Sequence, residues 1–205
     1  GPPGSGKSML AKRIPGIMPA MSLDEKLRVT KIHSICGLLL PGQSLVHKRP
    51  FRAPHHSISK ASLIGGGVVP KPGEITLATE GVLFFDEFAE FGKEVTELLR
   101  QPIESRTINI TRLHGGFEFP CNCMIVAAMN PCKCGFYPDF KCRCTEKDVN
   151  KNLSKISEPI LDRIEISVET FSMDLKNYNK ERKGECSKVI AERVEKTRKI
   201  QERRF

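Results

Sequence analysis

The octapeptide GPPGSGKS at residues 1–8 constrains the fold more than any other feature of the sequence. It fits the pattern G-x-x-x-x-G-K-[ST], in which a glycine-rich loop leads into a helix and its backbone N–H groups surround a phosphate. We expect Lys7 to reach the β- and γ-phosphates of a nucleotide and the Ser8 hydroxyl to bind Mg²⁺. The alternative is a chance glycine-rich turn. The expected phosphate-binding residues are Gly1, Pro2, Pro3, Gly4, Ser5, Gly6, Lys7 and Ser8.

Two acidic residues that follow a short apolar run are the expected partners of this loop. Residues 82–85 are Val, Leu, Phe and Phe, which is typical of a strand buried on both faces, and Asp86 and Glu87 come next. Acids at the carboxyl end of such a strand lie where α/β sheets bind ligands. We expect Asp86 to hold Mg²⁺ through water and Glu87 to act as the general base on the water that attacks ATP. The alternative is an ordinary strand with an acidic end.

Two more polar residues are candidates for the catalytic step. Asn130 follows an apolar strand expected near residues 124–128, so it can hydrogen-bond the γ-phosphate or orient the attacking water. The alternative is an Asn that caps the following loop. Arg163 lies where a ring-forming ATPase can present a guanidinium to the γ-phosphate of the neighbouring subunit. The alternative is a surface Arg paired with Asp162 or Glu165.

Four of the eight cysteines form two C-x-C pairs with seven residues between the pairs. Each pair can supply two thiolates to one ion. Four thiolates from the two pairs suit tetrahedral zinc, so we expect a structural Zn²⁺ site. Free thiols or a redox pair are the alternatives. A third C-x-C pair, Cys121 and Cys123, is expected to pack inside the protein, with a share in the metal site as the lesser possibility. The expected zinc ligands are Cys132, Cys134, Cys142 and Cys144.

A histidine pair and a hairpin leave alternatives open. His55 and His56 have no carboxylate at ligand spacing near them in the sequence, which favours hydrogen bonding within a loop. Contact with nucleic acid or with a neighbouring subunit is the alternative. Residues 107–112 and 117–119 are expected to pair as a β-hairpin around a glycine turn. With Arg112 and His114 near its tip, this hairpin is either a loop that grips a strand backbone or an extension that stabilises the sheet.

The order of elements indicates an α/β fold with a largely parallel sheet, because strands alternate with helices. A helix is expected from a capping box at residues 22–25 to about residue 36, another over residues 93–104, and a third from residue 185. Residues 164–168 are expected to form a third buried strand. The net charge is +9, and residues 175–205 hold eleven basic and five acidic residues, which is +6. This excess fits either nucleic-acid binding or a solvated helix, and no segment is long and apolar enough to span a membrane.

Taken together, these motifs resemble the magnesium-chelatase-like AAA+ family, in particular the ComM/YifB branch of bacterial proteins. The resemblance covers nearly the full chain in one collinear order. The run NPCKCG at residues 130–135 is specific to that branch, since the magnesium chelatase ATPase subunit lacks this cysteine pair. The matching segments are residues 1–8, 53–57, 63–67, 72–75, 81–87, 127–135 and 161–163.

The resemblance implies a P-loop NTPase of the AAA+ type: a three-layer αβα fold with a β-hairpin insertion and a cysteine-rich loop. It implies an ATP- and Mg²⁺-dependent cytoplasmic ring, a hexamer, with the hairpin facing the pore and DNA branch migration as its work. Two alternatives stay open. One is a chelatase-type ATPase acting on a protein partner. The other is a nucleic-acid-binding scaffold that does not hydrolyse ATP, although a general base such as Glu87 has little use there.

The ends of the sequence lead to a further expectation. The sequence opens inside the motif at Gly1, so we expect an AAA+ core at residues 1–172 without the strand that precedes the loop in this family. Residues 173–205 are expected to be a linker and a basic helix leading toward a missing C-terminal lid. Because unpaired strands expose backbone groups and apolar faces, we expect residues 1–205 alone to aggregate and to bind nucleotide weakly.

Overall fold

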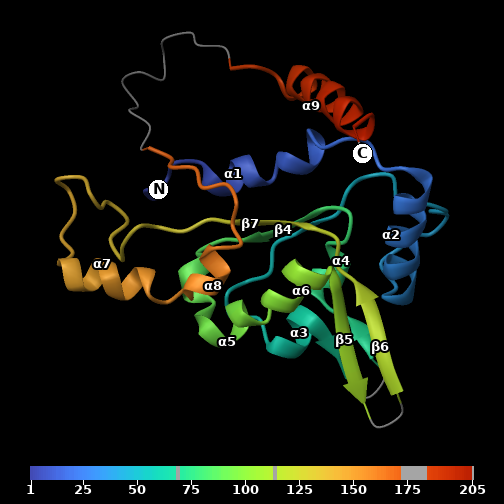
Figure 1. The fold of residues 1–205 in the computed structure, drawn as a ribbon, viewed down its shortest axis with the longest axis horizontal. Helices are drawn as coiled ribbons and strands as arrows, with labels where there is room; N and C mark the ends of the chain where they lie inside the picture. Colours follow the sequence, from blue (N-terminus) through green and yellow to red (C-terminus); the bar gives the residue numbers. More distant parts are fainter. Residues whose placement is uncertain (68–69, 113–114, 172–183, 205) are drawn as a thin grey trace.

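The computed structural model describes residues 1–67, 70–112, 115–171 and 184–204 (Figure 1). Its strands are β1 Phe51–Arg52, β2 Gly65–Gly66, β3 Lys71–Pro72, β4 Val82–Phe85, β5 Thr107–Arg112, β6 Gly115–Pro120 and β7 Met124–Ala127. Its α-helices are α1 Lys7–Ala11, α2 Leu23–Ile35, α3 Lys60–Ile64, α4 Glu74–Leu77, α5 Gly92–Glu97, α6 Arg100–Ser105, α7 Glu146–Leu153, α8 Glu158–Leu161 and α9 Ser187–Glu202. Short 3₁₀ helices lie at η1 Ile14–Gly16 and η2 Phe88–Glu90.

The central sheet has three parallel strands in the order β1-β4-β7. Phe51 pairs with Val82 at one edge of β4, and Val82 pairs with Met124 at the other. Since the strands run in one direction and start in register, the residues that follow them all emerge at the same edge of the sheet. This edge therefore gathers the chemistry-bearing residues that follow β1, β4 and β7.

The two faces of β4 belong to two different apolar cores. Val82 and Phe84 pack with Ala11 of α1 on one face. Leu83 and Phe85 pack on the other face with residues of α3, α4 and α8. Figure 1 shows α1 on one side of β4 and β7 and helices α3, α5, α6 and α8 on the other. This is the three-layer αβα arrangement of the predicted P-loop NTPase fold, and the α/β prediction is confirmed.

The predicted hairpin is present as β5 and β6, which pair antiparallel from Thr107 with Pro120 to Arg112 with Gly115. Ile108 and Ile110 are buried in the larger core and anchor the inner part of the hairpin. Its outer end extends from the body of the domain (Figure 1). His114, expected near the tip, lies outside the described residues.

Two predicted elements differ from the structure. The single helix expected over residues 93–104 is divided into α5 and α6, because Pro102 has no N–H to donate to the carbonyl four residues earlier and clashes with it. The strand expected at residues 164–168 is not assigned, and Ile166 and Val168 are 79% and 75% exposed. A strand needs a hydrogen-bonded neighbour, and within the described residues β7 pairs only with β4.

The other predicted helices are confirmed. Ser22 caps α2 and forms the expected capping box with Glu25. Helix α9 covers the predicted C-terminal helix and buries no residue. Residues 172–183, which hold most of the predicted linker, lie outside the described residues. Among the helices that the structure describes, none combines the length and the apolar composition needed to cross a membrane.

Candidate nucleotide-binding and metal sites

The glycine-rich loop depends on two left-handed glycines. Gly4 has φ 74° and Gly6 has φ 80°, conformations that glycine adopts without a steric penalty. Gly6 immediately precedes α1, and no side chain caps that helix. The N–H groups of the first turn have no acceptor within the helix, so they are available to an anion at its positive end. The backbone thus fits the predicted phosphate site.

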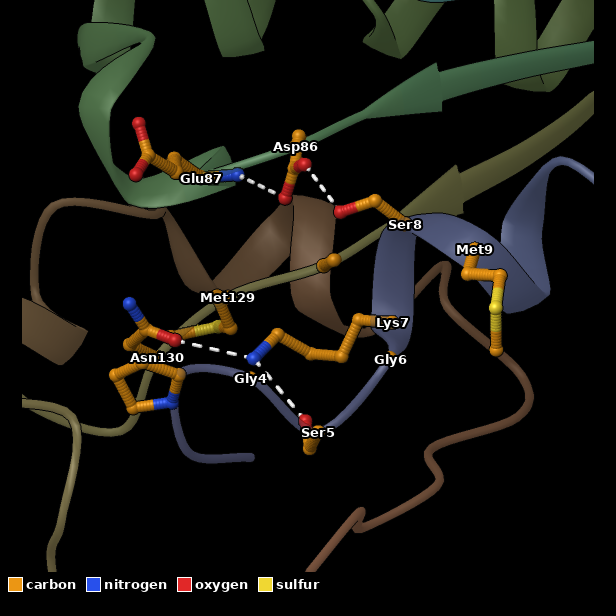
Figure 2. A pocket seen from close by; sticks show the side chains of 12 residues that line it. Gly4, Ser5, Gly6, Lys7, Ser8, Met9, Asp86, Glu87, Met129 and Asn130 are labelled. Carbon is orange, nitrogen blue, oxygen red and sulfur yellow. Dashed lines mark hydrogen bonds between the residues drawn. The ribbon is translucent and has the colours of Figure 1, made fainter. Parts of the chain in front are cut away.

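Lys7 lies at the centre of this loop. Its Nζ donates hydrogen bonds to the carbonyl oxygens of Gly1 (2.9 Å) and Pro2 (2.7 Å) and to Oδ1 of Asn130 (3.1 Å). Figure 2 shows Lys7 and Asn130 pointing toward each other across the pocket. Desolvation lowers the pKa of Lys7, and the charge of Asp86 partly opposes that shift. The structure therefore brings Asn130 to the loop lysine, and its expected contact with the γ-phosphate or the attacking water stays a prediction.

Ser8 and Asp86 form the expected oxygen pair. The Ser8 hydroxyl donates to Oδ2 of Asp86 at 2.5 Å, and the backbone N–H of Glu87 donates to the other carboxylate oxygen at 3.1 Å (Figure 2). A hydroxyl and a carboxylate are hard oxygen ligands, which suit Mg²⁺. Both residues line a cavity of about 390 Å³ together with Lys7 and Asn130. The donor set fits Mg²⁺ beside a phosphate.

Glu87 lies at the rim of this cavity and is directed away from the Asp86–Ser8 pair (Figure 2). Its backbone has φ 52° and ψ 47°, a left-handed conformation that is uncommon for a residue with a side chain. Its side chain is 59% exposed, and its Oε2 is 3.7 Å from Nδ1 of His56. The candidate base therefore contacts a histidine rather than the loop.

His55 and His56 make different contacts. His55 Nδ1 is 2.8 Å from the Ser57 hydroxyl and accepts the Ser57 N–H, which confirms the predicted hydrogen bonding within a loop. The ring of His56 contacts that of His55, with centroids 4.0 Å apart and planes tilted by 35°, and His56 faces Glu87. The sequence reasoning missed this contact. Local sequence gives no signal for it, because His56 and Glu87 lie beyond the ends of β1 and β4 and meet only through the pairing of those strands.

Arg163 follows α8 and lies outside the lining of the cavity in its own chain. Its guanidinium donates to the Pro159 carbonyl at 2.5 Å and pairs with Glu104. The alternative weighed from the sequence named Asp162 or Glu165 as its partner, whereas the ion pair formed is with Glu104 of α6. This placement leaves the predicted role in a neighbouring subunit as a prediction.

The structure gathers the two C-x-C pairs into one cluster. The four sulfur atoms lie within 4.8 Å of one another, with Cys132 to Cys134 at 3.4 Å and Cys132 to Cys142 at 3.8 Å. A tetrahedron of Zn–S bonds near 2.3 Å has sulfur–sulfur edges of about 3.8 Å, so the cluster fits zinc. Backbone N–H groups of Phe136 and Arg143 lower the pKa of Cys134 to about 6, whereas desolvation and the neighbouring cysteines raise the pKa of Cys142 to about 12. Within this coupled cluster, the thiolate form that binds metals is therefore favoured first at Cys134.

Cys121 and Cys123 belong to the apolar core and not to this cluster. Burial raises the pKa of Cys121 to about 11 and that of Cys123 to about 12, which keeps both thiols protonated. The prediction that this pair packs inside the protein is confirmed.

Comparisons with known proteins agree with this geometry. The family model described as "Magnesium chelatase, subunit ChlI" matches residues 1–178. The competence protein ComM of Haemophilus influenzae is 42% identical over 205 residues, covering 98% of this chain and 40% of that protein. YifB of Escherichia coli is 44% identical over 169 residues, covering 82% of this chain and 33% of that protein.

A solved structure is also similar in part. The crystal structure of NtrX from Brucella abortus in complex with ADP aligns with 81% of this chain and 29% of that chain, at 16% identity and a TM-score of 0.46. Among the sequence relatives, ComM is matched over about two fifths of its own length. By the extent of the family-model match and the identity to ComM and YifB, the chain belongs to the magnesium-chelatase-like AAA+ family of the ComM/YifB type.

Proposed function

We propose that this chain is the ATP-binding and ATP-hydrolysing core of a ring-forming motor that acts on DNA. The observation that carries the proposal is the set of Lys7, Ser8, Asp86 and Asn130 around one cavity, with Glu87 at its rim. These are the side chains that position a triphosphate and a water molecule in P-loop NTPases.

Each residue has a separate task in this proposal. Lys7 exchanges its bonds to loop carbonyls for bonds to the β- and γ-phosphates, and Asn130 orients the attacking water or the γ-phosphate. Ser8 and Asp86 would hold Mg²⁺, which would supply positive charge beside the phosphate oxygens. Glu87 accepts the proton of the water after its side chain turns from His56 toward the cavity.

The ring is supported by the position of Arg163. Arg163 follows α8 outside the lining of its own chain's cavity, and in this proposal its guanidinium exchanges the ion pair with Glu104 for the γ-phosphate of a neighbouring subunit. An arginine supplied in this way stabilises the transition-state charge. We propose a homo-hexamer, as the family resemblance implies.

DNA is the proposed substrate, and zinc is the proposed structural metal. The net charge of +9, the basic helix α9 and the projecting hairpin supply surfaces for a phosphate backbone. The similarity to a protein named for competence points in the same direction. The four-sulfur cluster would hold Zn²⁺, and its free thiols suit the reducing cytoplasm.

The test is ATP turnover by the full-length protein with and without single-stranded and branched DNA. Turnover is expected to rise with DNA, and Glu87→Gln is expected to lower it by about 10²- to 10⁴-fold while ATP binding remains. Glu94→Gln is the matched control, since Glu94 is exposed and pairs only with Lys60 among the contacts described. Wild-type turnover in a Glu87→Gln protein would contradict the proposed base.

A second candidate is a chelatase-type motor that acts on a protein partner, favoured by the description of the matched family model. Turnover that depends on Glu87 but does not respond to any DNA would support this candidate. It would leave the proposed ATPase intact and remove DNA as the substrate.

A further inference from the structure

The cysteine loop, defined here as residues 132–144, packs directly on the phosphate-binding loop. Gly135 has φ 81°, and a Cβ at this position would lie 2.4 Å from Cδ and 2.7 Å from Cγ of Pro3. Pro3 is part of the lining of the nucleotide cavity. Any side chain at residue 135 would therefore displace either the cysteine loop or the phosphate-binding loop.

Asn130 is held by residues at both ends of the cysteine loop. Only Pro131 separates Asn130 from Cys132, whose side chain is buried. Beyond the loop, Asn152 of α7 is 4% exposed and donates from Nδ2 to the main-chain oxygen of Asn130 at 3.1 Å. The position of Asn130, and with it the bond to Lys7, depends on how the loop is closed.

Gly135 is fixed by the metal-binding turn itself. Its N–H donates to the carbonyl of Cys132 at 3.0 Å, and Cys134 immediately precedes it. The sulfurs of Cys132, Cys134 and Cys142 lie 3.4 to 3.8 Å apart, and all four sulfurs of the cluster lie within 4.8 Å of one another without any covalent bond among them. A bound ion is what would hold this turn closed against Pro3.

We propose that a metal ion bound by the four cysteines holds Gly135 against Pro3 and Asn130 beside Lys7, so that nucleotide affinity depends on metal occupancy. The inference rests on the proposed nucleotide and zinc sites and adds a coupling between them. It assigns the cysteine loop a positioning role for the phosphate-binding loop, in addition to stabilising its own fold.

The experiment measures zinc content and the Kd for a fluorescent ADP analogue, at constant excess Mg²⁺, in the full-length protein. Removing zinc with a zinc-selective chelator is expected to weaken binding by about 10- to 100-fold, and added Zn²⁺ is expected to restore it. Unchanged affinity after zinc is gone would overturn the coupling, as would a protein that holds no metal when purified.

Gly135→Ala tests the contact separately from the metal. This variant is expected to keep its zinc and to bind the ADP analogue about 10-fold or more weakly. Gly42→Ala is the matched control, because Gly42 has φ 78° and no atom within 4 Å of an added Cβ. It introduces the same backbone strain without the clash, so its affinity and its zinc content should equal those of wild type.

The outcomes separate the coupling from the nucleotide site itself. If Gly135→Ala and Gly42→Ala bind the analogue equally well, the contact with Pro3 has no positioning role and the proposal fails. If the wild-type, zinc-loaded protein binds no nucleotide, the proposed function fails first. Melting temperatures that match between the two glycine variants show that a loss of affinity is not a loss of folding.

Discussion

Glu87 combines an unusual backbone with a contact outside the cavity. A left-handed conformation costs a non-glycine residue roughly 1–2 kcal/mol. The neighbouring N–H of Phe88 donates to the Ala128 carbonyl at 2.9 Å, which ties this turn to the residue after β7. The strained turn carries the side chain of Glu87 away from Asp86 (Figure 2). The Oε2 atom of Glu87 instead lies 3.7 Å from Nδ1 of His56. The contact with His56 therefore favours a resting arrangement in which the base is withdrawn.

We predict that His56→Ala raises the basal rate of ATP turnover. An exposed polar contact of this kind contributes up to about 1 kcal/mol, so its loss should increase the population of the inward Glu87 and the rate by about two- to fivefold. Steady-state phosphate release without DNA measures this, beside the Kd for nucleotide, which should not change. His55→Ala, which removes the Ser57 contact and the tilted ring contact with His56 but keeps the His56–Glu87 contact, serves as the control. A fall in basal turnover would show instead that His56 assists the base.

The sequence predicts which residues meet at the site better than it predicts how they point. Lys7, Ser8, Asp86 and Asn130 could be placed because each follows a recognisable loop or strand end, and parallel strands bring those ends together. The outward direction of Glu87 could not be predicted, since it depends on the left-handed turn and on His56. Those are contacts between segments 31 residues apart.

At the scale of elements, the two strands of the hairpin have different environments. Ile108 and Ile110 of β5 are buried against the core, whereas Phe117 of β6, the cross-strand partner of Ile110, is 43% exposed. An exposed aromatic ring on a projecting hairpin is suited to contact a nucleic-acid strand by stacking.

We predict that Phe117→Ala lowers the stimulation of ATP turnover by DNA and leaves basal turnover and the melting temperature unchanged. Ile110→Ala is the contrasting variant, because the cavity it creates should lower the free energy of unfolding by about 2–5 kcal/mol. Thermal melts and turnover with and without single-stranded DNA separate the two effects. Undiminished DNA stimulation in a stable Phe117→Ala protein would favour the alternative that the hairpin only extends the sheet.

The elements that the sequence mispredicts have identifiable causes. The apolar spacing over residues 93–104 fits one helix, but Pro102 divides it into α5 and α6. Residues 164–168 have the composition of a strand, yet pairing depends on a neighbouring strand, which local sequence cannot supply. Capping residues such as Ser22, in contrast, act within one turn and were predicted with their partner Glu25.

At the scale of the whole molecule, the cavity of one chain holds the base but not the arginine. Glu87 lies at the rim, and Arg163 follows α8 and is paired with Glu104. Arg163 can complete a neighbour's site only if the subunits meet head to tail, which is the interface that closes into a ring. Each active site of such a ring contains Glu87 of one subunit and Arg163 of the next.

Mixing two inactive variants tests this arrangement. Glu87→Gln and Arg163→Ala are each expected to lose nearly all turnover as pure proteins, while both still bind nucleotide. In rings assembled from an equal mixture, random head-to-tail neighbours give an intact Glu87 facing an intact Arg163 at about a quarter of the sites. Turnover should therefore recover to about a quarter of the wild-type rate. Mixtures that stay as inactive as the pure variants would place Arg163 in its own chain's site or in a purely structural pair with Glu104.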